Sequence, residues 1–162
     1  MNYMTAKDVM NPSVKTVPAS WSIEELSQFL IDKTITGAPV VEGDGRLVGV
    51  VSLTDIVKYD SLAELSLRAD EPHDYYLHGW ESQLSPDDLS SFHVEEKPQV
   101  TVRDIMTPFL FKVHEDTPIR EVADTMISGR IHRLLVTRGD NLVGIVTTMD
   151  MLQVIRNMGD KT

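Results

Sequence analysis

Residues 47–55 read LVGVVSLTD and residues 142–150 read LVGIVTTMD, so one nine-residue pattern occurs twice in this chain. The match extends toward the N-terminus, where residues 8–12 read DVMNP and residues 104–108 read DIMTP. Eleven aligned positions are identical up to the Gly-Asp turn of each copy, and five more are identical after it. Unrelated segments of that length would share roughly 3 residues. The chain therefore carries an internal duplication, which decides its fold.

The hydrophobic pattern of each copy changes its period in the same order. A short run typical of a β-strand comes first, and an amphipathic helix with apolar residues three or four apart follows it. Two apolar runs joined by a Gly-Asp turn then predict a β-hairpin, and a second helix begins directly after the hairpin. The expected strands are 14–17, 38–41 and 47–51 in the first copy and 110–113, 134–137 and 142–146 in the second, and the helices begin near Ile23, Ser52, Ile119 and Thr147.

These elements define an α/β (α+β) fold built from two β-α-β-β-α repeats. Roughly 50 residues with two faces to bury are marginally stable alone, so we expect the repeats to pack together with pseudo-two-fold symmetry. We assign residues 1–60 to the first repeat, 61–97 to a connecting insert and 98–162 to the second repeat.

The insert differs in composition from both repeats. Residues 60–97 contain 10 of the 25 acidic residues but only 2 of the 15 basic ones. The preceding helix is expected to run on through Leu62, Leu65 and Leu67, and the SPDD sequence at 85–88 is typical of the start of another short helix. Two interpretations of the insert stay open, a solvated acidic linker and a partner-docking surface around Tyr75, Tyr76 and Trp80.

Composition excludes several classes of function. The 162 residues, 41% of them hydrophobic, suffice for a buried core, and no apolar run approaches the ~18 residues of a membrane span. A net charge of −10 disfavours nucleic acid as the main partner. The lack of cysteine excludes disulfides, thiolate metal sites and a cysteine nucleophile. The N-terminus has no signal-like pattern, so we expect a cytoplasmic protein, or one of the plastid stroma if it comes from a plant.

The repeated closing motif, which is Gly, two aliphatic residues, Ser or Thr, two further residues and Asp, is similar to that of cystathionine-β-synthase (CBS) domains. The opening Asp-aliphatic-Met segment followed by Pro, and the strand Ala38-Pro39-Val40-Val41 before a Gly-Asp turn, resemble the same family. The resemblance covers both copies in register. It implies a stand-alone tandem CBS pair, in which two clefts hold adenosine ligands such as AMP, ADP, ATP or S-adenosylmethionine and thereby regulate an associated protein.

The end of each hairpin supplies the first candidate ligand contacts. Ser52 and Thr147 stand where a strand gives way to a helix, and Asp55 and Asp150 lie three residues further on, which is the spacing of a capping box. Capping explains this spacing by itself. The same geometry places a carboxylate at a helix N-terminus, and the resemblance implies that it accepts ribose hydroxyls.

A basic cluster occurs in the second copy alone. Arg130, His132 and Arg133 precede its central strand, where the first copy has Thr34, Thr36 and Gly37. Guanidinium groups pair bidentately with phosphate oxygens, so this cluster favours a phosphorylated ligand. The alternative is a surface pair that neutralises nearby acids such as Asp124.

The resemblance also implies a flat apolar slot for adenine between the first strand, the Met-containing segment and the central strand of the pair. The residues at these positions are Thr16, Val17, Ala38, Pro39, Met106, Lys112 and Val113. As isolated residues they fit a plain hydrophobic core better. The second copy has Leu135 in place of Pro39, which predicts unequal affinities in the two clefts.

From these features we expect a regulatory sensor of AMP, ADP or ATP that forms a homodimer and modulates a partner protein. The amphipathic helix over 119–126 supplies a face for the dimer. The alternative is a ligand-independent adaptor that acts through the insert and the dimer surface. We expect no catalytic residues, because no nucleophile, paired base or cofactor motif is present. We also expect no metal, because His73 and His78, near Asp70, Glu71 and Asp74, lack the spacing of a metal site.

Overall fold

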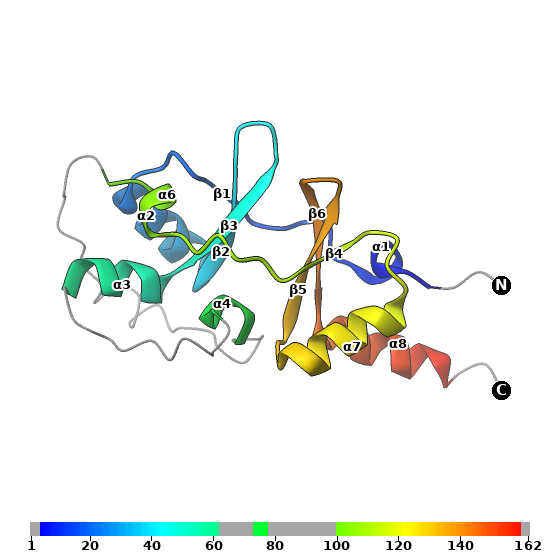
Figure 1. Ribbon diagram of the computed structural model, residues 1–162. Coiled ribbons are helices and arrows are strands. Elements are labelled where there is room, and N and C mark those ends of the chain that lie inside the picture. The colour runs from blue at the N-terminus through cyan, green and yellow to red at the C-terminus, as the bar shows by residue number, and fades with distance from the viewer. Residues whose placement is uncertain (1–3, 62–72, 78–99, 160–162) are drawn as a thin grey trace. The chain divides into compact units, whose positions relative to one another are not determined.

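The computed structural model describes residues 4–61, 73–77 and 100–159 (Figure 1). The chain divides into two compact units, of which unit 1 comprises Met1–Val14 and Phe111–Thr162 and unit 2 comprises Lys15–Leu110. Each unit contains one three-stranded sheet. The mixed α/β fold predicted from the sequence is therefore confirmed. The expected helix extension over 62–67, the helix start at 85–88 and Trp80 lie outside the described residues.

The elements of unit 2 follow the order predicted for the first repeat. They are β1 (Val17–Pro18), α2 (Ile23–Lys33), β2 (Gly37–Val41), β3 (Leu47–Ser52) and α3 (Leu53–Ser61), with the short helices α4 (Asp74–Leu77) and α6 (Val102–Ile105). Strand β1 is parallel to β2, and β2 and β3 form an antiparallel hairpin. The sequence predicts the first strand at 14–17, whereas β1 begins at Val17, because only Val17 and Pro18 pair with β2.

Unit 1 has the same arrangement. Its elements are α1 (Ala6–Val9), β4 (Lys112–His114), α7 (Ile119–Gly129), β5 (Arg133–Arg138), β6 (Asn141–Thr147) and α8 (Thr148–Met158). Strand β4 is parallel to β5, and β5 and β6 form the hairpin. The turn between them contains Gly139 with a φ of 60°, a conformation that glycine adopts without steric cost.

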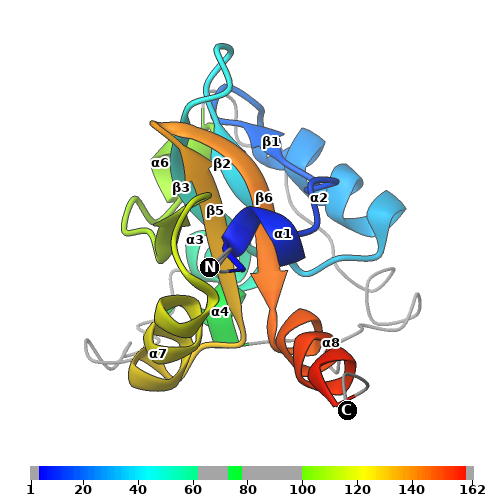
Figure 2. The ribbon, with the colours of Figure 1, turned by 90° about the vertical axis from the view of Figure 1, so that its right-hand side faces the viewer.

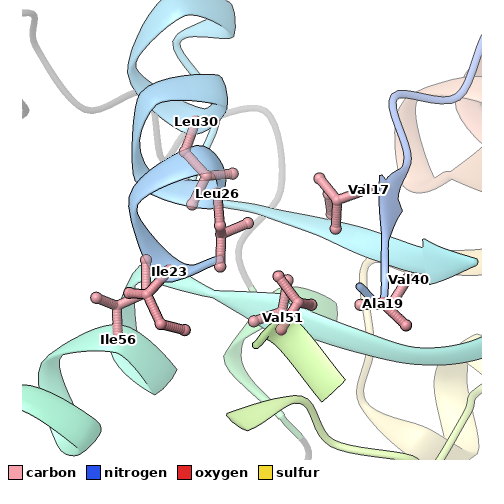
Figure 3. Packing of buried hydrophobic residues seen from close by; sticks show 10 residues of the cluster. Val17, Ala19, Ile23, Leu26, Leu30, Val40, Val51 and Ile56 are labelled. Carbon is pink, nitrogen blue, oxygen red and sulfur yellow. The ribbon is translucent and has the colours of Figure 1, made fainter. Parts of the chain in front are cut away.

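The core of unit 2 lies between α2 and its sheet (Figure 3). Leu26 and Leu30, one helical turn apart on α2, are fully buried together with Val17 of β1 and Val51 of β3. Each such side chain contributes about 1.5–3 kcal/mol by leaving water. Helix α2 begins at a capping box, in which the backbone N–H of Glu25 donates to Ser22 Oγ at 3.1 Å. Burial and capping together fix the helix over the strands that carry the candidate site.

The opening segments of the two copies are exchanged between the units. In unit 2, Thr107 and Val50 exchange two backbone hydrogen bonds of 2.9 Å, which tie the segment after α6 to strand β3. In unit 1, Asn11 and Ile145 exchange bonds of 2.8 and 3.0 Å, which tie the segment after α1 to β6. Figure 2 shows α1 beside β6. Each compact unit therefore combines the hairpin of one copy with the Asp-aliphatic-Met segment of the other.

Candidate functional site

The first candidate site, which we call the β3–α3 corner, is formed where β3 ends at Ser52 and α3 begins. The backbone N–H of Ser52 donates to Asp55 Oδ2 at 2.8 Å, and the Ser52 hydroxyl lies 3.4 Å from the same oxygen. Both residues are buried, with 1% of Ser52 and 7% of Asp55 exposed. The predicted capping contact is therefore present, and it uses one oxygen of the carboxylate.

The second candidate site, the β6–α8 corner, has the same construction in unit 1. The backbone N–H and the hydroxyl of Thr147 donate to Asp150 Oδ2 at 2.8 and 2.9 Å, and the N–H of Asp150 lies 3.4 Å from the Thr147 hydroxyl. Asp150 is half-buried. Within the described residues, all of its hydrogen bonds are to Thr147 and all use Oδ2 or the backbone N–H. Its Oδ1 therefore makes no hydrogen bond to the part of the chain that the structure describes.

The β3–α3 corner has an additional partner that sequence analysis missed. His73 Nε2 lies 2.8 Å from Asp55 Oδ2, and the backbone N–H of Tyr75 donates to His73 Nδ1 at 3.1 Å. Because Nδ1 accepts that bond, the ring hydrogen of neutral His73 is on Nε2 and points at the carboxylate. The sequence contains no signal for this contact, because the spacing between His73 and Asp55 matches no motif.

The three basic residues of the second copy differ in their exposure and in their relation to the β6–α8 corner. Arg133 is half-buried at the start of β5 and stands directly opposite Thr147 in the hairpin register. Directly opposed residues in a hairpin have Cβ atoms about 5 Å apart, so Arg133 lies beside the corner. His132 is exposed, and its carbonyl accepts from Thr148 N–H at 3.0 Å. Arg130 is exposed and ends α7 with a φ of 52°.

The expected adenine-slot residues divide between the two units. Val17, Ala38 and Pro39 are buried in unit 2, where Val17 and Ala38 belong to the hydrophobic core, and Thr16 and Met106 are half-buried. Lys112 and Val113 form β4 of unit 1, with Lys112 exposed and Val113 half-buried. The structure thus brings Thr16, Val17, Ala38, Pro39, Ser52, Asp55 and Met106 together in one unit, and Lys112, Val113, Arg130, His132, Arg133, Thr147 and Asp150 in the other.

Met10 is a second residue whose contact was not predicted from the sequence. It packs on Gly144 of β6, as Met106 packs on Gly49 of β3. The alignment of the two copies contains the necessary signal, because Met10 and Met106 occupy matching positions.

Two ion pairs hold the edge of unit 1. Arg138 Nη2 donates to Glu115 Oε2 at 2.7 Å, and this bond lowers the pKa of the Glu115 carboxyl. Lys7 Nζ donates to Asp116 Oδ1 at 2.7 Å, which lowers the pKa of Asp116 and raises that of Lys7. Among the described residues, one group of three possible metal ligands, His114, Glu115 and Asp116, lies within 4.8 Å. Both of its carboxylates already face cationic side chains.

The family model of the CBS domain matches residues 6–62 and 102–157, and the chain belongs to this family. An uncharacterized protein of Methanocaldococcus jannaschii, MJ1426, is 30% identical over 94% of this chain and 91% of its own length. The tandem repeat and the family resemblance of the sequence are therefore confirmed. In the part of the chain that the structure describes, no helix has the length and apolar character of a membrane span.

Solved structures agree with this assignment. The CBS domain pair of protein MJ0100, in complex with 5′-methylthioadenosine and S-adenosyl-L-methionine, is 25% identical with a TM-score of 0.60, over 97% of this chain and 99% of that one. The cytosolic domain of the Mg²⁺ channel MgtE, in complex with ATP, is 28% identical with a TM-score of 0.61, over 94% of this chain and 50% of that one. Both are complexes with adenosine-containing ligands.

Proposed function

We propose that the chain is a cytoplasmic regulatory module that binds an adenosine nucleotide, namely AMP, ADP or ATP, and modulates a partner protein. The observation that carries the proposal is the Asp150 carboxylate at the first turn of α8, whose Oδ1 makes no hydrogen bond to the described residues, together with Arg133 opposite Thr147 in the hairpin register. The ligands present in the MJ0100 and MgtE structures support an adenosine compound.

The β6–α8 corner combines the two groups that such a ligand needs. A carboxylate oxygen accepts the hydrogen of a ribose hydroxyl, and the N-terminal end of an 11-residue helix favours negative charge. The guanidinium group of Arg133 supplies bidentate donors for phosphate. Adenosine compounds with phosphates are therefore preferred over the uncharged nucleoside.

Calorimetric titration tests this proposal directly. Wild-type protein is titrated with AMP, ADP, ATP, adenosine and S-adenosylmethionine, in parallel with Asp150→Asn and the control Asp140→Asn. Asp140 lies exposed in the β5–β6 turn, so its substitution changes the charge equally without touching the corner. Binding that is lost in Asp150→Asn and kept in Asp140→Asn supports the proposal. Absence of heat and of any melting shift with millimolar AMP, ADP or ATP contradicts it.

An adaptor that needs no ligand is the second candidate, and exposed apolar side chains in unit 1 favour it. Ile127 at the end of α7 and Leu152, Ile155 and Met158 of α8 are 56–74% exposed. The helix face over 119–126, which the sequence predicts as the dimer surface, is not this exposed surface, because Val122 and Met126 are buried inside unit 1.

We propose that the exposed side chains of α7 and α8 are covered by a second copy of the chain, which makes the module a homodimer. This homodimer is compatible with nucleotide binding.

A further inference from the structure

The two corners differ in what the fold places against the carboxylate. At the β3–α3 corner, Asp55 is 7% exposed and bonded to His73, whose side chain is 9% exposed. At the β6–α8 corner, Asp150 is half-buried and, within the described residues, bonded to Thr147 alone. Equivalent carboxylates of a duplicated motif therefore have unequal surroundings.

Helix α4 is the element that makes the difference. This helix packs on β3. Its residues Tyr75 and Tyr76 are 4% and 0% exposed, and their rings meet edge to face with centroids 5.4 Å apart. A Cβ built on Gly37 would approach Tyr75 Cδ2 to 3.2 Å. Gly37 pairs with Ser52, so the Tyr75 ring covers the strand ends beside Asp55. In the second copy this position is Arg133, which pairs with Thr147.

The two copies therefore differ in the residue that pairs with the strand end, which is Gly37 in the first copy and Arg133 in the second. Glycine leaves room above the strand end, and an aromatic side chain from the insert packs into that room. The matching position of the second copy carries the guanidinium group of Arg133, which can pair with phosphate oxygens. The first copy therefore has α4 at its corner, and the second has a cationic side chain at the equivalent position.

We propose that His73 and α4 are an internal occupant of the β3–α3 corner and compete with a nucleotide for Asp55. This inference rests on the function proposed above, and it adds a structural feature that determines how many of the two corners bind nucleotide. The wild-type protein then binds nucleotide at Asp150 with higher affinity than at Asp55, because a ligand at Asp55 must first break the His73 bond and displace α4. A buried hydrogen bond to a charged group reduces affinity by roughly tenfold or more when a ligand has to replace it.

The test removes the stronger site first. Calorimetric titration with AMP compares Asp150→Asn with the double variants Asp150→Asn/His73→Ala and Asp150→Asn/His73→Gln. Loss of the imidazole frees Asp55, so the alanine variant is expected to bind AMP at least about tenfold more tightly than Asp150→Asn alone. Glutamine places an amide donor near the position that His73 Nε2 occupies in the wild type. The Asp150→Asn/His73→Gln variant is therefore expected to bind AMP like Asp150→Asn alone. Circular dichroism melting verifies that each variant is folded.

Two further variants make the outcomes specific. His114→Ala in the Asp150→Asn background removes an exposed histidine of β4 and is expected to change nothing. Adding Asp55→Asn to the His73→Ala variant is expected to abolish the gain. If His73→Ala leaves AMP binding unchanged or weaker in the Asp150→Asn background, the inference is overturned. Binding of AMP by the wild type upholds the proposed function independently of that result. If neither wild type nor the single variant His73→Ala binds AMP, both the proposed function and this inference fail.

Discussion

Met106 lies against Gly49 so closely that a Cβ at position 49 would come within 2.8 Å of the methionine sulfur. Met10 stands in the same relation to Gly144, where a Cβ would come within 2.8 Å of Met10 Cγ. Met106 comes from the opening segment of the second copy and Gly49 from the hairpin of the first. The glycine of the repeated closing motif is therefore explained by close approach of an exchanged segment.

Substitution of the two glycines is expected to have unequal effects. In Gly49→Ala the new Cβ meets the carbonyl oxygen of Thr107 at 2.8 Å as well as the Met106 sulfur. That carbonyl accepts a hydrogen bond from Val50, so it has little room to move, and the free energy of unfolding should fall by about 1–3 kcal/mol. In Gly144→Ala the three atoms nearest the new Cβ belong to the side chain of Met10, which is flexible, so this substitution should cost less. Urea denaturation measures both.

Shortening the methionines provides the control for this comparison. Met10→Ala should restore most of the stability lost in Gly144→Ala, relative to Met10→Ala alone, because it removes the atoms that clash. Met106→Ala should restore little in Gly49→Ala, since the Thr107 carbonyl remains. Equal rescue in both pairs would show that the backbone contact at Thr107 is unimportant.

The duplicated pattern predicts the elements better than their assembly. Helix α2 follows from apolar residues at positions 23, 26 and 30 and from the Ser22 cap, which are local features of the chain. The exchange of α1 and α6 depends on backbone bonds between segments far apart in sequence, such as Asn11 with Ile145, and no local periodicity encodes it.

The candidate site shows the same division. The spacing of Ser52 and Asp55, and of Thr147 and Asp150, predicts the contacts between carboxylate and strand end, because three residues span one turn of a helix. His73 lies 18 residues from Asp55 in an acidic stretch without periodicity. Its contact depends on where the insert folds back onto β3, and that packing is visible only in three dimensions.

The stability of unit 1 should decrease in acid because of Glu115. The bond from Arg138 lowers the pKa of this carboxyl in the folded protein, whereas an unfolded Glu titrates near pH 4.3. The stabilising effect is therefore complete above the unfolded pKa and is lost as the pH falls through the lower folded value. Glu115→Gln should lower the melting temperature at pH 7, and the difference from wild type should shrink below about pH 4. A constant difference down to pH 2 would contradict the ion-pair explanation.

Self-association should depend on the apolar face of α8. Ile155 is 65% exposed and Leu152, one turn earlier, is 56% exposed, so a charge introduced at position 155 would be desolvated in a dimer. Ile155→Asp is expected to weaken dimerisation at least tenfold without lowering the melting temperature of the dissociated protein. The exposed Gln153→Asp on the same helix should have little effect. Sedimentation velocity measures both, and a wild-type mass of 18.2 kDa at every concentration would rule out the homodimer.

The nucleotide contacts of the β6–α8 corner should separate into phosphate and ribose contributions. Arg133→Ala removes a group that only a phosphorylated ligand uses, so it should weaken AMP and ATP by roughly 10- to 150-fold and adenosine far less. Asp150→Ala should weaken all three alike, because each carries the ribose. Asp55→Ala should matter less in the wild type, since His73 already occupies that carboxylate. Arg120→Ala, an exposed change on α7, is the charge-matched control for titration calorimetry. Equal losses for adenosine and its phosphates in Arg133→Ala would assign the guanidinium group a structural role and would favour the adaptor.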